Sequence, residues 1–146
     1  MKIYIANDHA GLEMKNAIST YLKTKYEIVN LGTNTKDSVD YPDYAFKLGE
    51  IVAKDKDSIG ILICGTGFGM CLAVNKVKGI RAVNLVDVNT APLAKQHNNA
   101  NVICLSARFS SFENNQAIIE AFMDAQFETR HQQRLDKVTK YEREHG

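Results

Sequence analysis

The sequence lacks a surplus of charge of either sign. Its 146 residues include 18 Lys plus Arg and 17 Asp plus Glu, a formal net charge of +1 with neutral histidines. A nearly balanced chain creates no broad electrostatic field that would attract nucleic acid or an acidic membrane surface. We therefore expect neither as a partner, and any anion site must be local.

Long apolar runs, linkers and repeats are also missing. No apolar run approaches the roughly 20 residues that a bilayer-crossing helix needs, and residues 2–6 form a strand-like segment rather than a secretion signal. A domain of about 150 residues can bury roughly 70% of the surface that its unfolded chain exposes. We expect one domain, residues 1–146, located in the cytoplasm.

The three cysteines, Cys64, Cys71 and Cys104, form no C-x-x-C pair and are odd in number. This usage suits reduced thiols better than a disulfide framework or a structural zinc site. We expect no structural zinc site, and at least one thiol is a candidate for chemistry.

Five short β-rich runs alternate with helical patterns. This alternation predicts an α/β, Rossmann-like fold, with helices on both faces of a parallel sheet and a C-terminal helix. In the first helix, the spacing of Met14, Ala17, Ile18, Tyr21 and Leu22 predicts a core stripe. The predicted strands are residues 2–6, 26–31, 58–64, 81–86 and 102–105; the predicted helices include 11–23, 44–53 and 130–144, with others after the glycines near 65–69, from 89–92 and from 110 or 111.

Ligands of open parallel sheets bind beyond the carboxyl ends of the strands. The stretch "SIGILICGTGFGM", residues 58–70, ends a predicted buried strand at Cys64 and then alternates Gly65, Gly67 and Gly69 with other residues. Backbone amides and the helix N-terminus that follows favour an anion, so Cys64 is a candidate thiolate base or nucleophile. Thr66 adds a hydroxyl. The structural alternative is that Cys64 is a small buried hydrophobe.

The glycine loop has competing interpretations. A dinucleotide fingerprint needs Gly or Ala where Met70 stands, although Asp87 lies at a suitable distance for a ribose contact. A Walker loop needs an absent Gly-Lys-Ser or Gly-Lys-Thr, and a thiol phosphatase needs arginine in place of Met70. The remaining interpretation is a group of backbone N–H donors beside a thiolate, able to stabilise a negatively charged substrate oxygen.

Two further polar stretches contain candidate site residues. "NDHAG" places Asp8 and His9 after the first strand, and "KQHNNAN" places His97 and Asn98 before the fifth. Asp-His after a strand often forms only a turn and a helix cap, and a loop histidine is often merely solvated. An imidazole with an ordinary pKa near 6.5 nevertheless suits proton transfer.

Arginines gather near the C-terminal end of the chain. Arg108 follows the fifth strand, and "TRHQQRL" places Arg130 and Arg134 on one helical face, with His131 nearby. Such a face is usually only solvated. In an otherwise neutral protein, however, these three arginines predict a phosphate clamp.

Several motifs in the same order resemble the type B ribose-5-phosphate isomerases and their relatives for allose and galactose 6-phosphates. The resemblance runs from end to end, through "NDHAG", "DYPDYA", "LICGTGFGM", "NKVKGIRA", "KQHNNANV", "SARF" and "RHQQR". It implies a three-layer αβα sandwich with a five-stranded parallel sheet. It also implies a homodimer or a tetramer made of two dimers, sites shared between subunits, and no metal or cofactor.

The resemblance also implies a role for each matching residue. Cys64 would move a proton between C2 and C1 of the sugar, with Thr66, Gly65, Gly67 and Gly69 holding the enediolate oxygens. Asp8 and His97 would open the furanose ring, and Tyr41 and Asn98 would contact the sugar. His9, Arg108, Arg130 and Arg134 would bind the phosphate, and His131 would assist. Two positions depart from the usual pattern: Asn7 stands where many members have cysteine, and Cys71 where many have serine.

The leading hypothesis is therefore interconversion of ribose 5-phosphate and ribulose 5-phosphate, a step of the pentose phosphate pathway. The reaction needs a base beside an oxyanion cradle, and residues 64–69 supply both. One alternative is an isomerase for allose 6-phosphate or another hexose 6-phosphate. Others are a nucleotide-binding module and, third, a thiol hydrolase.

Overall fold

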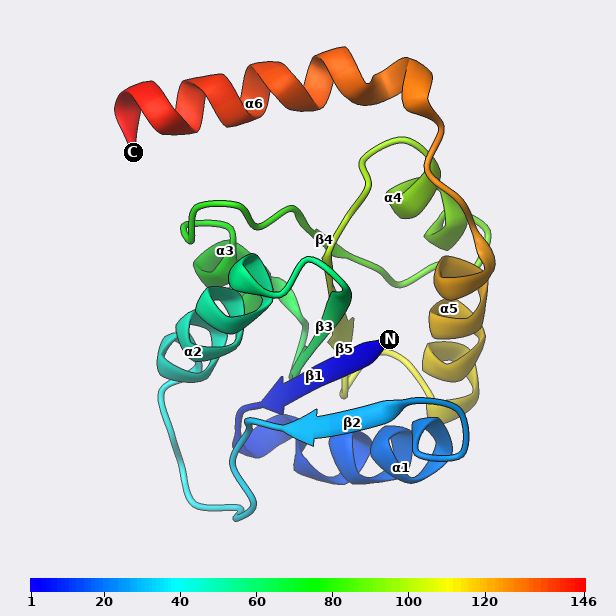
Figure 1. Ribbon diagram of the computed structural model, residues 1–146. Coiled ribbons are helices and arrows are strands. Elements are labelled where there is room, and N and C mark those ends of the chain that lie inside the picture. The colour runs from blue at the N-terminus through cyan, green and yellow to red at the C-terminus, as the bar shows by residue number, and fades with distance from the viewer.

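Strands and helices alternate along the computed structural model, which describes residues 1–146 (Figure 1). The strands are β1 (Lys2–Asn7), β2 (Glu27–Asn30), β3 (Ser58–Cys64), β4 (Ala82–Asn84) and β5 (Val102–Ser106). The helices are α1 (Leu12–Leu22), α2 (Tyr41–Lys54), α3 (Phe68–Val74), α4 (Ala91–Gln96), α5 (Phe112–Asp124) and α6 (Gln132–His145), with short 3-10 turns η1 (His9–Gly11) and η2 (Thr129–His131). None of these helices has both the length and the apolar character required to cross a bilayer.

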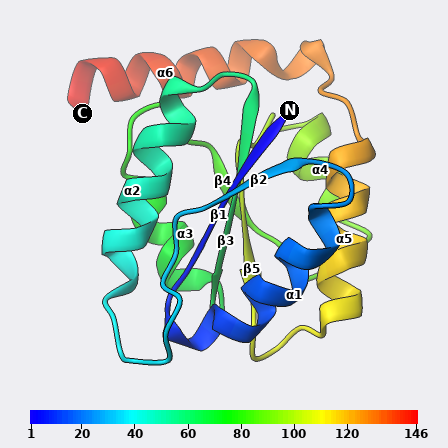
Figure 2. The ribbon, with the colours of Figure 1, turned by 60° about the horizontal axis from the view of Figure 1, so that its bottom comes forward.

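All five strands are parallel, in the order β2-β1-β3-β5-β4. Helices α2 and α3 cover one face of the sheet, and α1, α4 and α5 cover the other (Figure 2). Leu48, Val52 and Met70 belong to the core under α2 and α3, whereas Ile18 and Phe122 belong to the core on the opposite face. The prediction of a three-layer αβα sandwich with a five-stranded parallel sheet is confirmed.

Several element boundaries differ from the predictions. Helix α2 begins at Tyr41, three residues earlier than predicted, because Pro42 occupies the first helical turn, where its missing N–H costs no hydrogen bond. Strand β4 lies at the sheet edge and pairs with β5 over three residues only. The Ser111 hydroxyl accepts a hydrogen bond from the Asn114 N–H at 3.0 Å, which fixes the start of α5.

The buried face of α1 differs from the predicted stripe. Ile18 and Leu22 are buried as expected, but Ala17 is exposed, and the buried positions include Lys15 and Ser19. The polar segment between β2 and α2 packs against this face and covers the Lys15 side chain, as its hydrogen bonds to Thr33 and Asn34 show.

Helix α6 lies across the end of the sheet where the strands begin (Figures 1 and 2). None of its residues is buried, and Val138 and Tyr141 are largely exposed. A hydrogen bond from the Gly79 N–H to Glu142 Oε1, at 2.9 Å, ties its C-terminal half to the loop before β4.

Candidate active site

Cys64 ends the central strand, β3, all of whose residues are buried. Its side chain is 5% exposed and belongs to the apolar core under α2 and α3. Its sulfur nevertheless accepts a hydrogen bond from the backbone N–H of Gly67 at 3.2 Å. Cys64 is therefore buried, as the structural alternative expected, while a backbone amide points at its sulfur, as the functional one expected.

Gly67 has a conformation that other residues rarely adopt. Its φ is +85°, in the left-handed region. A Cβ at this position would collide with Oδ1 of Asn84, at the end of β4. Glycine therefore allows the loop to turn and bring its amide to the sulfur.

The other two glycines of the loop lie against predicted site residues. A Cβ on Gly69 would lie 2.8 Å from Cε1 and Cζ of the Tyr41 ring, and one on Gly65 would lie 3.2 Å from the Arg108 guanidinium. The Arg108 N–H also donates to the Gly65 carbonyl oxygen at 3.0 Å. The structure thus gathers Tyr41 and Arg108 around the loop that follows Cys64.

Asp8 and His9 lie beside this loop, at the end of β1. Oδ1 of Asp8 accepts hydrogen bonds from the N–H groups of Ala10 and Gly11 at 3.0 and 3.2 Å, which is the capping role named as its alternative. Nδ1 of His9 accepts a hydrogen bond from the Val39 N–H at 3.2 Å. A neutral His9 ring therefore carries its proton on Nε2, free to donate to a ligand.

The remaining predicted residues lie at the opposite end of the sheet. Gly60 pairs with Val102 where β3 and β5 begin, and Cys64 pairs with Ser106 where they end. At about 3.3 Å per residue, these levels are roughly 13 Å apart. Residues that precede β5, or that pack with the C-terminus of α4, therefore lie at the end away from Cys64 (Figure 2). They are His97, Asn98, Arg130, His131 and Arg134.

Arg108 therefore lies apart from Arg130 and Arg134 within a single chain. Arg108 follows β5 and lies at the Cys64 end. Arg130 and Arg134 lie in η2 and the first turn of α6, which the Glu128 N–H ties to the Gln96 carbonyl oxygen at 2.9 Å. Since parallel strands all begin at one end, a loop that enters a strand cannot share an edge with a loop that leaves one.

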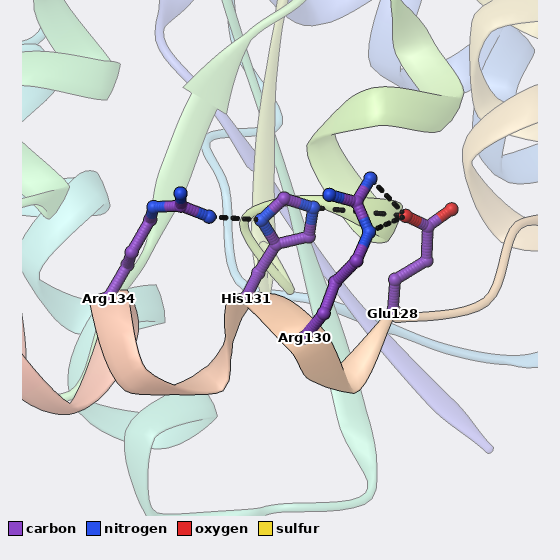
Figure 3. A network of polar contacts seen from close by, with 4 residues as sticks. All are labelled: Glu128, Arg130, His131 and Arg134. Carbon is purple, nitrogen blue, oxygen red and sulfur yellow. Dashed lines mark hydrogen bonds and ion pairs between the residues drawn. The ribbon is translucent and has the colours of Figure 1, made fainter.

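The end of the sheet away from Cys64 carries a network of polar side chains, formed by Glu128, Arg130, His131 and Arg134 (Figure 3). Nε and Nη2 of Arg130 donate to Glu128 Oε1 at 3.2 and 2.9 Å. Nη1 of Arg134 lies 2.9 Å from His131 Nδ1, and the His97 ring packs against His131 with centroids 4.5 Å apart. Glu128 was not among the predicted residues, although it stands two positions before Arg130 in "ETRHQQR".

The surroundings of His131 favour its neutral form. Burial lowers its pKa, and the positive charges of Arg130 and Arg134 lower it further, together with His97. A neutral ring can accept the Arg134 hydrogen bond at Nδ1, which leaves the proton on Nε2. The His131 imidazole thus orients the Arg134 guanidinium, and the Glu128 carboxylate orients that of Arg130.

His97, Glu128 and His131 place three potential metal-binding atoms within 4.8 Å of one another. This set does not fit a cation, because the Arg134 contact leaves the His131 proton on the nitrogen nearer Glu128 and two guanidinium groups adjoin the cluster. The local charge favours an anion instead.

Asp87 and the two remaining cysteines lie outside the candidate site chemistry. Oδ1 of Asp87 accepts a hydrogen bond from the Asn89 N–H at 2.8 Å in the turn before α4. One oxygen of the carboxylate considered for a ribose contact is therefore already bonded within its own turn. Cys104 is fully buried, and burial raises the pKa of its thiol. Cys71 in α3 is half-buried, its thiol donates to the Ala82 carbonyl oxygen at 3.7 Å, and the neighbouring Cys104 thiol lowers its pKa.

The fold and the loop define an α/β protein with a thiol and backbone amides at the carboxyl ends of its parallel strands. Residues 3–138 match the family model for ribose/galactose isomerases, and the chain belongs to that family.

Two solved structures and one further relative extend the match over nearly the whole chain. Ribose-5-phosphate isomerase B from Mycoplasma genitalium, in a crystal structure with bound ribulose 5-phosphate, is 51% identical, with a TM-score of 0.94 over 98% of this chain and 97% of that one. The enzyme of the same name from Clostridium thermocellum is 38% identical, with a TM-score of 0.96 over 100% of both chains. Ribose-5-phosphate isomerase B of Escherichia coli is 39% identical over 97% of this chain and 96% of its own length.

Proposed function

We propose that the protein is an isomerase that interconverts ribose 5-phosphate and ribulose 5-phosphate without a cofactor. The observation that carries the proposal is the Gly67 N–H directed at the Cys64 sulfur, at 3.2 Å. It lies in a chain that is 51% identical to an isomerase whose structure holds ribulose 5-phosphate. The reaction is the pentose phosphate pathway step that the sequence predicted.

The chemistry needs a base and a cradle for negative charge. In the aldose-to-ketose direction, the Cys64 thiolate removes the proton from C2, and the electron pair of that bond forms the enediolate. The hydroxyl proton moves from O2 to O1, and the same thiol returns the carbon-bound proton to C1, so the ketose forms and the base is regenerated. The amides of Gly65, Gly67 and Gly69, with the Thr66 hydroxyl, stabilise the charge on the sugar oxygens because they are already fixed before it develops.

The proposal requires a second copy of the chain. Within one molecule, about four strand residues separate the end of the sheet at Cys64 from the end near His97, Arg130 and Arg134. A homodimer partner would therefore supply these three residues to each Cys64 loop. Exposed apolar side chains support this arrangement, since Phe68 and Phe109 flank a hollow beside Thr66 at the Cys64 end. A tetramer made of two such dimers is the larger assembly in this proposal.

The role proposed for each remaining site residue depends on the end of the sheet at which it lies. At the Cys64 end, Asp8 would assist ring opening, Tyr41 would contact the sugar, and His9 and Arg108 would reach the phosphate. From the partner, His97 and Asn98 would act on the sugar ring, and Arg130 and Arg134 would bind the phosphate, with His131 orienting Arg134. A phosphate held away from the reacting carbons gives binding energy that keeps the open chain in place.

The proposal also treats residues 1–146 as one domain in the cytoplasm. The two apolar clusters flank a single sheet, which supports one domain. The three cysteines are free, which suits a reducing compartment.

A panel of aldose phosphates tests the proposed function. We expect ketose formation from ribose 5-phosphate with a higher kcat/KM than from allose 6-phosphate, and no loss of rate when a chelator is present. Preference for a hexose 6-phosphate would support the alternative isomerase, and loss of rate with the chelator would contradict a metal-free reaction. Absence of isomerisation, together with a rise in Tm with a nucleotide but not with sugar phosphates, would overturn the proposal.

A further inference from the structure

Lys15 carries a charge that the proposed chemistry does not use. Its side chain is 1% exposed, on the buried face of α1. Its Nζ donates to the Thr33 carbonyl oxygen at 3.1 Å and to Asn34 Oδ1 at 2.8 Å, and it forms no ion pair with a carboxylate. Burial lowers its pKa. Since a buried ammonium with only neutral acceptors is costly, its presence calls for a reason.

The acceptors of Lys15 belong to residues 31–40, which connect β2 to α2 without a helix or strand. Other groups hold the same part of this segment: the Asn7 side-chain amide donates to the Thr33 carbonyl oxygen at 3.3 Å, and that of Asn30 donates to Asn34 Oδ1 at 2.7 Å. The first half of the segment is therefore fastened to α1 and to β1.

The second half of the segment reaches the candidate active site. The Val39 N–H donates to Nδ1 of His9 at 3.2 Å and so sets the orientation and tautomer of that ring. Tyr41 follows directly, with its ring against Gly69 of the loop after Cys64. One continuous segment therefore joins the Lys15 ammonium to two residues of the proposed substrate site.

We propose that Lys15 is a positioning residue, whose ammonium fastens residues 31–40 to α1 and thereby holds His9 and Tyr41 where the substrate binds. The proposal rests on the proposed function, in which these two residues contact the phosphate and the sugar. Lys15 itself donates hydrogen bonds to Thr33 and Asn34, and to neither His9 nor Tyr41.

Lys15→Met separates this role from a purely structural one. Methionine is apolar and of similar length, and the variant leaves Thr33 with its Asn7 donor and Asn34 with its Asn30 donor. Because replacing a buried charge with an apolar side chain is often neutral or stabilising, we expect Tm to stay constant or rise. We expect KM for ribose 5-phosphate to rise about tenfold while kcat changes by less than about twofold, since binding contacts are lost without loss of the base.

Limited proteolysis reports on the segment without any substrate. Lys36 lies in its exposed middle, with a side chain 75% exposed. We expect trypsin to cleave after Lys36 faster in Lys15→Met than in the wild type, as measured by mass spectrometry. The matched control is Lys23→Met, an exposed lysine directly after α1, for which KM, Tm and the cleavage rate should match the wild type.

Two results would overturn the proposal: a lower Tm with unchanged KM, which identifies a merely structural lysine, or wild-type cleavage after Lys36 in Lys15→Met. If the wild-type protein isomerises no aldose phosphate, the proposed function fails. The cleavage rate then still decides whether Lys15 fastens the segment.

Discussion

The amide hydrogen of Gly67 points at the sulfur of Cys64, with nitrogen and sulfur 3.2 Å apart. This contact depends on a backbone with φ of +85° at Gly67, and on the lack of a side chain that would strike Asn84. The strand end and the loop thus form one unit, in which the thiol and an anion-stabilising donor are placed together.

Gly67→Ala tests whether this geometry matters for activity. We expect a loss of stability of about 1–3 kcal/mol, because alanine is strained at this φ and its Cβ meets Asn84, and a fall in kcat as the amide turns away from the sulfur. Urea unfolding and initial rates measure the two effects.

Gly79→Ala is the matched control for Gly67→Ala. Gly79 has φ of +88°, but a Cβ there meets only Ala53, at 3.5 Å. It should lose stability with kcat unchanged. An equal kcat in Gly67→Ala and the wild type would show that the loop amide is not part of the chemistry.

Mixing two inactive variants tests whether the site is shared between subunits. Cys64→Ala and Arg134→Ala lie at opposite ends of the sheet, so in a mixed dimer one site would carry both changes and the other neither. After unfolding and refolding together in equal amounts, about a quarter of wild-type activity should return, because half of randomly paired dimers are mixed. Activity no higher than that of the separate variants would contradict a shared site.

The lowered pKa of His131 predicts how substrate binding and stability depend on pH. His131 accepts the Arg134 hydrogen bond only while neutral, and Glu128, Arg130, Arg134 and His97 are the titratable or charged groups that face it. As pH falls toward the lowered pKa, protonation removes the acceptor and repels Arg134, so KM should rise.

Stability should follow the same direction. Since the unfolded imidazole, with a pKa of about 6.5, binds protons more readily than the folded one, stability is highest above that pH and declines as pH falls through the interval between the two values. In His131→Asn this contribution is removed. Measurements of KM and Tm against pH in both proteins check it; identical profiles would contradict the role given to His131.

Much of the fold followed from the sequence, because apolar runs such as residues 58–64 are long enough to predict a buried strand and glycines predict a shaped loop. The edge that holds Cys64, Asp8 and Arg108 was predicted from strand ends alone. The sequence did not predict that Arg108 lies at one end of the sheet and Arg130 and Arg134 at the other. Spacing along a helix tells which residues share a face but not where that helix packs. Lys15 was missed because lysine rarely lies in a core, and only its partners in residues 31–40 make burial possible.

Cys64→Ala is the variant that tests the central claim most directly, with isomerisation of ribose 5-phosphate and its equilibrium binding measured on the same preparation. We predict that kcat falls by about a thousandfold, because the proton acceptor is gone, while the Kd for ribose 5-phosphate changes by less than about threefold. A Cys64→Ala protein that retains more than about a tenth of the wild-type kcat would contradict the assignment of this thiol as the base.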